Sequence, residues 1–110
     1  MKINLQQENG ITTAVIDETR LDASVAPEFM SEMDRIITSG NDQIIIDISK
    51  LSFMDSSSLG AMVSVLKKIS ATGKMVIFGA SGTVLELFKL TRMDRIFTLT
   101  NDLETAKTHF

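Results

Sequence analysis

The most informative hydrophobic pattern of the chain runs through residues 43–69. Residues 44–48 form an apolar, β-branched run that is interrupted only by Asp47 and flanked by polar residues. A short run of this kind predicts a strand that is buried on both faces. From Leu59 onward, apolar residues return at every third or fourth position, which predicts a helix with one face in the core. The expected core face consists of Leu59, Met62, Val63, Leu66 and Ile69.

The flanking sequence predicts further strands. Residues 2–8 alternate weakly, residues 11–16 are rich in β-formers, and Asn9-Gly10 between them is a strong hairpin signal. We therefore expect two antiparallel strands at the start of the chain. Two more strands are predicted, over residues 75–78 and 96–99.

Helical spacing of apolar residues predicts a helix over residues 26–37, after a polar linker at residues 17–20. Ser24 is the expected cap of this helix. Pro27 fits its first turn, where no N–H bond is lost, and Gly40 is expected just past its end.

Two further helices are expected in the second half of the chain. Ser81 should cap the first of them, whose apolar residues are Val84, Leu85, Leu87, Phe88 and Leu90. Asn101 and Glu104 have the spacing of a capping box before a last helix with Leu103 and Ala106. Strands that alternate with helices form βαβ units. The sequence therefore predicts one α/β domain over residues 1–110, with a mixed, mostly parallel β-sheet flanked by about four α-helices.

Composition and charge narrow the possible functions. The 110 residues, 44% of them hydrophobic, are enough for one compact core. The absence of cysteine excludes disulfides and thiol chemistry and fits a reducing cytoplasm. No secretory signal is evident, and no apolar segment approaches the ~20 residues of a membrane span. The net charge of −3 argues against nucleic acid as a partner. We expect a cytoplasmic protein that binds neither a membrane nor nucleic acid.

The residues that could carry catalysis are few. His109 is the only histidine, and no G-x-S-x-G motif frames a serine, which argues against a serine hydrolase. Asp22, Asp47 and Asp55 are spread along the chain without a D-x-D loop, so no metal site is expected. The glycines of residues 79–82 lack the P-loop lysine and are interpreted as a turn with a cap. The sequence therefore gives no support to a serine hydrolase, a metal site or a P-loop nucleotide site.

The run Asp55-Ser56-Ser57-Ser58 stands where the central strand leads into the helix. One capping residue is enough for a helix N-terminus, so four in a row should leave at least two hydroxyls exposed. A helix N-terminus also tolerates a phosphate, because its free N–H groups and its dipole favour negative charge. Ser56 could gain about −1.5 to −2 charges beside Asp55, and a docked partner would then be repelled. The alternative is that the serines only cap the helix.

A partner would also contact the outer face of the helix. If the core face is as predicted, the residues left outward include Ala61, Ser64, Val65 and Lys68. Their small and mildly apolar side chains would suit a contact with another protein.

Residues 51–69 read LSFMDSSSLGAMVSVLKKI and follow the run IIIDI. This stretch resembles the STAS-domain anti-sigma factor antagonists, in which a strand, a D-S-[ST]-G-L-G-like motif and a helix follow one another. Residues 21–27 resemble the I/L-D segment before the first helix of that family. Residues 87–97 resemble its third helix and the following strand, so the resemblance covers nearly the whole chain.

The resemblance implies a bacterial partner-switching protein with a role in signal transduction and transcription regulation. In that family the serine after the motif aspartate is phosphorylated by a serine kinase that is itself the anti-sigma factor, and this position is Ser56 here. The unphosphorylated form binds the kinase, the phosphorylated form is released, and a metal-dependent serine phosphatase resets it. ATP and the metal ion belong to these partners, so the resemblance implies a substrate and ligand that is not an enzyme and binds no cofactor of its own. A monomer is expected.

Asp22 and Asp55 match acidic positions near the family's phosphoacceptor. The chain departs from the family where Ser58 replaces the usual motif glycine and where Thr19 replaces a glycine before the I/L-D segment. Ser57 and Ser58 therefore stay open as alternative acceptors, and we expect both to contact the partner. Two other functions also stay open: a constitutive STAS scaffold in a larger signalling or transport assembly, and a small nucleotide-binding domain or enzyme.

Overall fold

The computed structural model describes all residues, 1–110, and contains a five-stranded sheet with the order β1-β2-β4-β6-β7. The strands are β1 (Ile3–Glu8), β2 (Ile11–Ile16), β4 (Gln43–Asp47), β6 (Lys74–Phe78) and β7 (Leu99–Thr100). β1 pairs with β2 in antiparallel orientation, through the predicted Asn9-Gly10 turn, and all other neighbours are parallel. The predicted mixed, mostly parallel sheet is thus confirmed.

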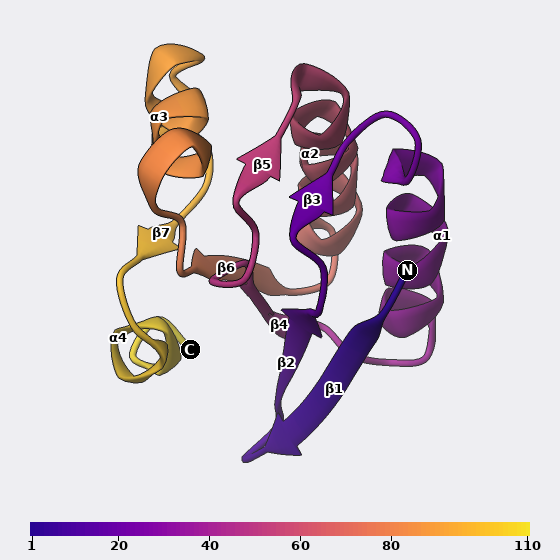
Figure 1. Cartoon of the computed structure of the whole chain (residues 1–110). Coiled ribbons are helices and arrows are strands. Elements are labelled where there is room, and N and C mark those ends of the chain that lie inside the picture. The colour runs from indigo at the N-terminus through magenta and orange to yellow at the C-terminus, as the bar shows by residue number, and fades with distance from the viewer.

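The helices cover the two faces of this sheet unequally (Figure 1). Buried residues of α1 (Ala26–Thr38), α2 (Ser56–Ser70) and α3 (Gly82–Leu90) form one cluster with alternate residues of the strands. The short α4 (Leu103–Lys107) packs on the opposite face, where its Ala106 meets β4 and β6. This division follows from the alternation of side chains along a strand. None of the helices has the length and apolar character needed to cross a bilayer.

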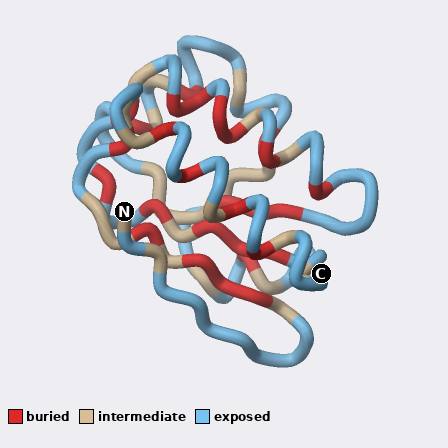
Figure 2. Tube along the Cα trace, turned by 90° about the vertical axis from the view of Figure 1, so that its right-hand side faces the viewer, coloured by how far each residue is buried: buried red, intermediate tan, exposed pale blue.

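Strand β4 lies at the centre of the sheet, as the sequence predicts. Ile44 and Ile46 belong to the large cluster under α1–α3, whereas Ile45 faces α4, and all three are fully buried. Figure 2 shows buried segments along the inner strands and an exposed outer strand, β1. The strand is therefore buried on both faces because helices lie above and below it.

A second, two-stranded sheet was not predicted from the sequence. β3 (Arg20–Leu21) pairs in parallel with β5 (Phe53–Met54), beyond the carboxyl ends of β2 and β4 (Figure 1). Two-residue strands are too short to produce a periodic hydrophobic pattern. The pair brings the segment before α1 next to the segment before α2, and so forms the end of the molecule that carries the serines.

Two predicted helix caps are wrong by one residue. Val25, not Ser24, is the N-cap of α1, because the hydroxyl of Ser24 donates to the carboxylate of Asp22 in the preceding turn. Asp102, not Asn101, caps α4 and accepts the N–H of Thr105 at 2.7 Å.

The other predicted helix ends are confirmed, although one cap lacks its side-chain hydrogen bond. Pro27 lies in the first turn of α1, and Gly40 follows its end with a φ of 102°. Ser81 occupies the N-cap position of α3, but its side chain makes no cap hydrogen bond.

The last strand begins later than predicted. A 3-10 turn, η1 (Met93–Arg95), precedes it, and the carbonyl of Met93 accepts the N–H groups of Ile96 and Phe97. This turn directs the ring of Phe97 edge-on to Phe88, with 5.6 Å between ring centres. Only Leu99 and Thr100 then pair with β6.

Two glycines provide a matched test of this packing. A Cβ on Gly73 would collide with the backbone carbonyl of Asp42, whereas a Cβ on Gly60, inside α2, would meet open space. We expect Gly73→Ala to lower the free energy of unfolding by about 1–3 kcal/mol through overpacking. Gly60→Ala should raise it by about 0.5–1 kcal/mol through better helix propensity. Urea denaturation measures both, and a shift of the same sign in the two variants would contradict the packing described here.

Candidate functional site

The candidate site lies where the segment after β3 meets the first turn of α2, at the upper end of the view in Figure 1. Asp55 is the N-cap of α2, and its Oδ1 accepts the N–H of Ser58 at 2.9 Å. Its Oδ2 accepts the N–H of Ala23, 32 positions earlier in the chain, at 3.0 Å. One carboxylate therefore caps the helix and also fixes the segment that leads into α1.

Ser58 is a structural residue in this chain. Its side chain is fully buried, and its hydroxyl donates to the carbonyl of Leu21 while lying 3.0 Å from Oδ1 of Asp55. It belongs to the first turn of α2 and has no positive φ, so the residue that replaces the motif glycine is unstrained. The burial of this hydroxyl contradicts the expectation that Ser58 could be an acceptor or a partner contact, because a kinase cannot reach it.

Ser56 and Ser57 differ from Ser58 because both are exposed at the start of α2. The expectation that at least two hydroxyls face solvent is thus confirmed. Ser56 is the first residue of the helix and directly follows Asp55. The carboxylate of Asp55 is in turn held in position by two backbone N–H groups.

Two carboxylates give this end of the molecule its negative charge. The N–H of Ser58 is the main cause that lowers the pKa of Asp55, and it outweighs desolvation, which acts in the opposite direction. The hydroxyl of Ser24 is the main cause that lowers the pKa of Asp22, although the charge of Asp55 raises it. Both groups are therefore anions at neutral pH. Arg20 partly balances them, with its Nε 3.6 Å from Oδ2 of Asp22.

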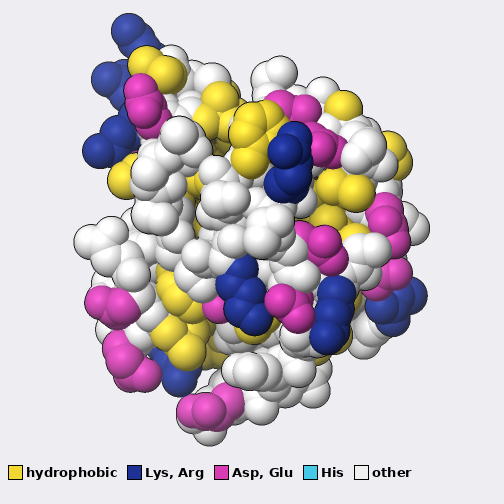
Figure 3. All heavy atoms as spheres, viewed as in Figure 1, with side chains coloured by type: hydrophobic (Ala, Val, Ile, Leu, Met, Phe, Trp, Pro, Cys, Tyr) yellow, Lys and Arg dark blue, Asp and Glu magenta, His cyan; other side chains and the backbone are white.

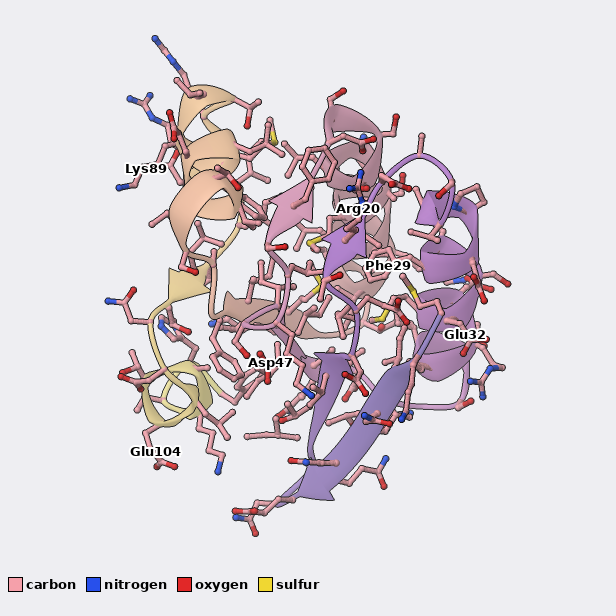
Figure 4. All side chains as sticks on the ribbon, viewed as in Figure 1. Arg20, Phe29, Glu32, Asp47, Lys89 and Glu104 are labelled. Atoms are coloured by element: carbon pink, nitrogen blue, oxygen red, sulfur yellow. The ribbon has the colours of Figure 1, made fainter.

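Arg20 also takes part in a contact that sequence analysis missed. Its guanidinium carbon lies 4.8 Å from the centre of the Phe53 ring, which is 40% exposed. Arg20, labelled in Figure 4, comes from β3, and Figure 3 shows a basic side chain against hydrophobic atoms in this region. The sequence pattern indicates only a polar linker over residues 17–20. The available signal is an aromatic residue, Phe53, shortly before the serine run.

A shallow apolar hollow of about 330 Å³ continues from Phe53 toward α3. Its lining residues are Phe53, Met54, Thr83, Glu86, Leu87 and Leu90. Leu90 is 75% exposed, the highest value among the large apolar side chains. Grouped exposed apolar side chains are typical of surfaces that contact other molecules.

The outer face of α2 differs from the prediction. Ala61 and Val65, expected to point outward, are each 4% exposed because they pack in the large core cluster, and α2 lies against α1 as well as the sheet. Ser64 and Lys68 are exposed as expected, and Lys68 forms an ion pair with Asp34 of α1. Val63 and Leu66, expected in the core, are only partly buried. No three His, Cys, Asp or Glu side chains come together in an arrangement that could hold a metal ion.

Comparisons with known proteins agree with the resemblance seen in the sequence. Residues 2–106 match the family model of the STAS domain. An anti-sigma-B factor antagonist of Listeria monocytogenes is 28% identical over 82 residues, which cover 74% of this chain and 72% of the relative.

Two solved structures show the same fold. An anti-sigma factor antagonist from Mycobacterium paratuberculosis has a TM-score of 0.88 at 18% identity and covers 98% of this chain and 92% of its own. The Bacillus cell fate determinant SpoIIAA in its phosphorylated form has a TM-score of 0.70 at 19% identity and covers 99% of this chain and 100% of its own. At these identities the likeness concerns the fold alone.

The buried hydroxyl of Ser58 can be tested by substitution. We expect Ser58→Ala to lower the free energy of unfolding by about 1–2 kcal/mol, because the carbonyl of Leu21 loses its partner. Ser58→Gly should lower it by about 1 kcal/mol more, because glycine weakens a helix. Ser57→Ala, at the exposed neighbour, is the control and should stay within about 0.5 kcal/mol of the wild type. A Ser58→Gly variant as stable as the wild type in urea would show that this hydroxyl is dispensable.

The cap made by Asp55 should give a pH-dependent stability. Asp55→Ala should lower the free energy of unfolding by about 1 kcal/mol at neutral pH, because the helix cap is lost. Because the pKa of Asp55 is lower in the folded chain, its stabilisation is complete above the ordinary pKa of about 3.9 and is lost as the pH falls through the folded pKa. The difference in free energy of unfolding between wild type and variant should therefore shrink in acid. Glu86→Ala, at an exposed position on α3, is the control. If the difference in free energy of unfolding between wild type and Asp55→Ala did not change with pH, the role of Asp55 as a cap would be refuted.

Proposed function

Because the chain belongs to the STAS domain family, we propose that it is an anti-sigma factor antagonist whose binding is switched by phosphorylation of Ser56. The unphosphorylated chain binds a serine kinase that is also an anti-sigma factor, and so frees a sigma factor in the bacterial cytoplasm. Phosphorylation releases the chain, and a metal-dependent serine phosphatase restores it. The observation that carries this proposal is the exposed Ser56 hydroxyl at the start of α2, directly after a fixed carboxylate.

Three considerations favour Ser56 as the acceptor. Its hydroxyl is exposed, whereas that of Ser58 is buried and hydrogen-bonded. It also directly follows Asp55, which is the position that the family resemblance assigns to the acceptor. The first N–H groups of a helix have no partner within the helix, and the dipole favours negative charge there. A phosphate on Ser56 would therefore leave α2 folded.

The phosphate acts on the partner through charge. It adds about −1.5 to −2 charges next to the ionised Asp55 and Asp22. A partner that covers this end would have to bury a dense group of negative charges without matching cations, which is strongly unfavourable. The chain supplies only the hydroxyl, while ATP and the metal ion belong to the kinase. The chain is thus a substrate and a ligand, not an enzyme.

The partner surface extends from the serines over the neighbouring exposed residues. Aromatic and arginine side chains are enriched at the energetic centres of protein contacts, and the Arg20–Phe53 pair is of this kind. It lies between the two acidic residues and the apolar hollow on α3. Ser57, Ser64 and Lys68 extend the surface along α2, whereas the buried Ala61 and Val65 are no longer part of it. Phosphorylated Ser56 would thus lie within the partner's footprint.

Substitutions at Ser56 test the switch. We expect Ser56→Ala to bind the isolated kinase like the unphosphorylated wild type and to accept no phosphate. Ser56→Asp should bind about ten-fold more weakly or worse, because it adds a permanent charge to the acidic group. Ser70→Asp adds the same charge at the far end of α2 and should bind like the wild type.

Surface plasmon resonance measures these affinities, and mass spectrometry locates the phosphate. Equal affinity of the Ser56→Ala and Ser56→Asp variants would contradict the proposal. A chain that carries no phosphate after reaction with the kinase and ATP would instead favour a constitutive scaffold whose serines only cap the helix.

A further inference from the structure

The two edges of the five-stranded sheet differ in their protection. The β7 edge is only two residues long and is followed by α4. The β1 edge is six residues long, its register with β2 has no bulge, and β2 is the only element against which it packs extensively. Residues 4–8 are exposed (Figure 2), as their burial classes show. No proline or charged residue lies between Ile3 and Gln7. Proteins usually protect such an edge with charges, proline or a bulge, so this unprotected strand calls for an explanation.

The pairing of β1 with β2 determines which main-chain groups are free. The carbonyl of Lys2 accepts the N–H of Asp17 at 2.9 Å, so even-numbered residues of β1 bond toward β2. In an antiparallel ladder these positions alternate. The N–H and C=O groups of Ile3, Leu5 and Gln7 therefore point outward, away from the sheet.

We propose that β1 pairs with β1 of a second copy of this chain, in antiparallel orientation, about a two-fold axis at Leu5. In this register Leu5 faces Leu5, and Ile3 faces Gln7 of the second copy. All three are residues with outward main-chain groups, so each facing pair can exchange two hydrogen bonds. The result is one continuous sheet across two chains, in place of the monomer that the sequence suggests.

The side chains favour the same register. Lys2 faces Glu8 of the second copy, and by symmetry this pair of opposite charges occurs twice. Both side chains are free to turn toward the second copy, since Lys2 is 68% and Glu8 70% exposed. Their present ion pairs within the chain are long, at 3.5 Å from Lys2 to Asp17 and 3.7 Å from Glu8 to Lys107. Leu5, 44% exposed, would be covered by its own counterpart. A shift of the register by two residues would separate the charges, so the charge pattern selects this pairing.

The dimer leaves the proposed phosphorylation site open. Ser56 lies at the end of the molecule opposite the Asn9-Gly10 turn, whereas pairing uses only the outer side of β1 (Figure 1). Stable protein interfaces bury ~1,200–2,000 Å² of surface. A pairing that uses only the six residues of β1 forms a smaller interface, so the association should be weak and appear at high protein concentration. This inference stands apart from the switch at Ser56, because it needs neither kinase nor phosphate.

Reversing the charges that face each other across the two-fold axis tests the proposal. Self-association is measured by sedimentation velocity at protein concentrations from micromolar to millimolar. Lys2→Glu and Glu8→Lys should each weaken self-association about ten-fold, because two cross-strand pairs change from attractive to repulsive. The double variant should restore it, and an equimolar mixture of the two single variants should associate. A wild type that remains monomeric at millimolar concentration, or a double variant as weak as the single ones, would overturn the proposal.

A proline substitution provides an independent check. Leu5→Pro removes only an outward N–H group, so it should keep the β1–β2 ladder yet abolish self-association. Amide NMR spectra would confirm that the variant is folded. Lys50→Glu, at an exposed position outside the strand, is the matched surface control and should associate like the wild type. Association of a folded Leu5→Pro variant with wild-type affinity would mean that another surface is used, and would reject the β1 pairing.

Discussion

The carboxylate of Asp55 joins two parts of the chain that are far apart in sequence. It caps α2 through the N–H of Ser58 and holds the N–H of Ala23 with its other oxygen. The hydroxyl of Ser58 adds a third link, to the carbonyl of Leu21. These bonds hold the acidic turn around Asp22 against the first turn of α2. Without them the short β3–β5 pair would be the main tie between the segments that precede α1 and α2.

This arrangement divides structural and exposed roles among four neighbouring polar residues. Asp55 and Ser58 satisfy main-chain groups, and their side chains are partly or fully withdrawn from solvent. Ser56 and Ser57 satisfy none of these groups and stay exposed. A helix N-terminus needs only one good cap. The chain can therefore carry free hydroxyls at this end and still keep a fixed first turn.

Structural features that depend on the residues of a single element could be predicted from the sequence. The isoleucines of β4 and the Asn9-Gly10 hairpin are local signals, and both are confirmed. Other predictions fail where a contact outside the element decides. Ala61 and Val65 are buried because α1 lies against a second side of α2, which the spacing within α2 cannot show. Ser24 looks like a cap, but Asp22 in the preceding turn binds its hydroxyl. Likewise the buried role of Ser58 depends on Leu21, 37 positions away.

The fixed position of Asp55 bears directly on how a phosphate at Ser56 would act. A flexible carboxylate could turn away from a new dianion and relieve much of the repulsion. Asp55 cannot do so without giving up the N–H groups of Ser58 and Ala23, which would leave main-chain donors unpaired. The negative charges would thus be held together, and the partner that covers them, not the chain itself, would have to move.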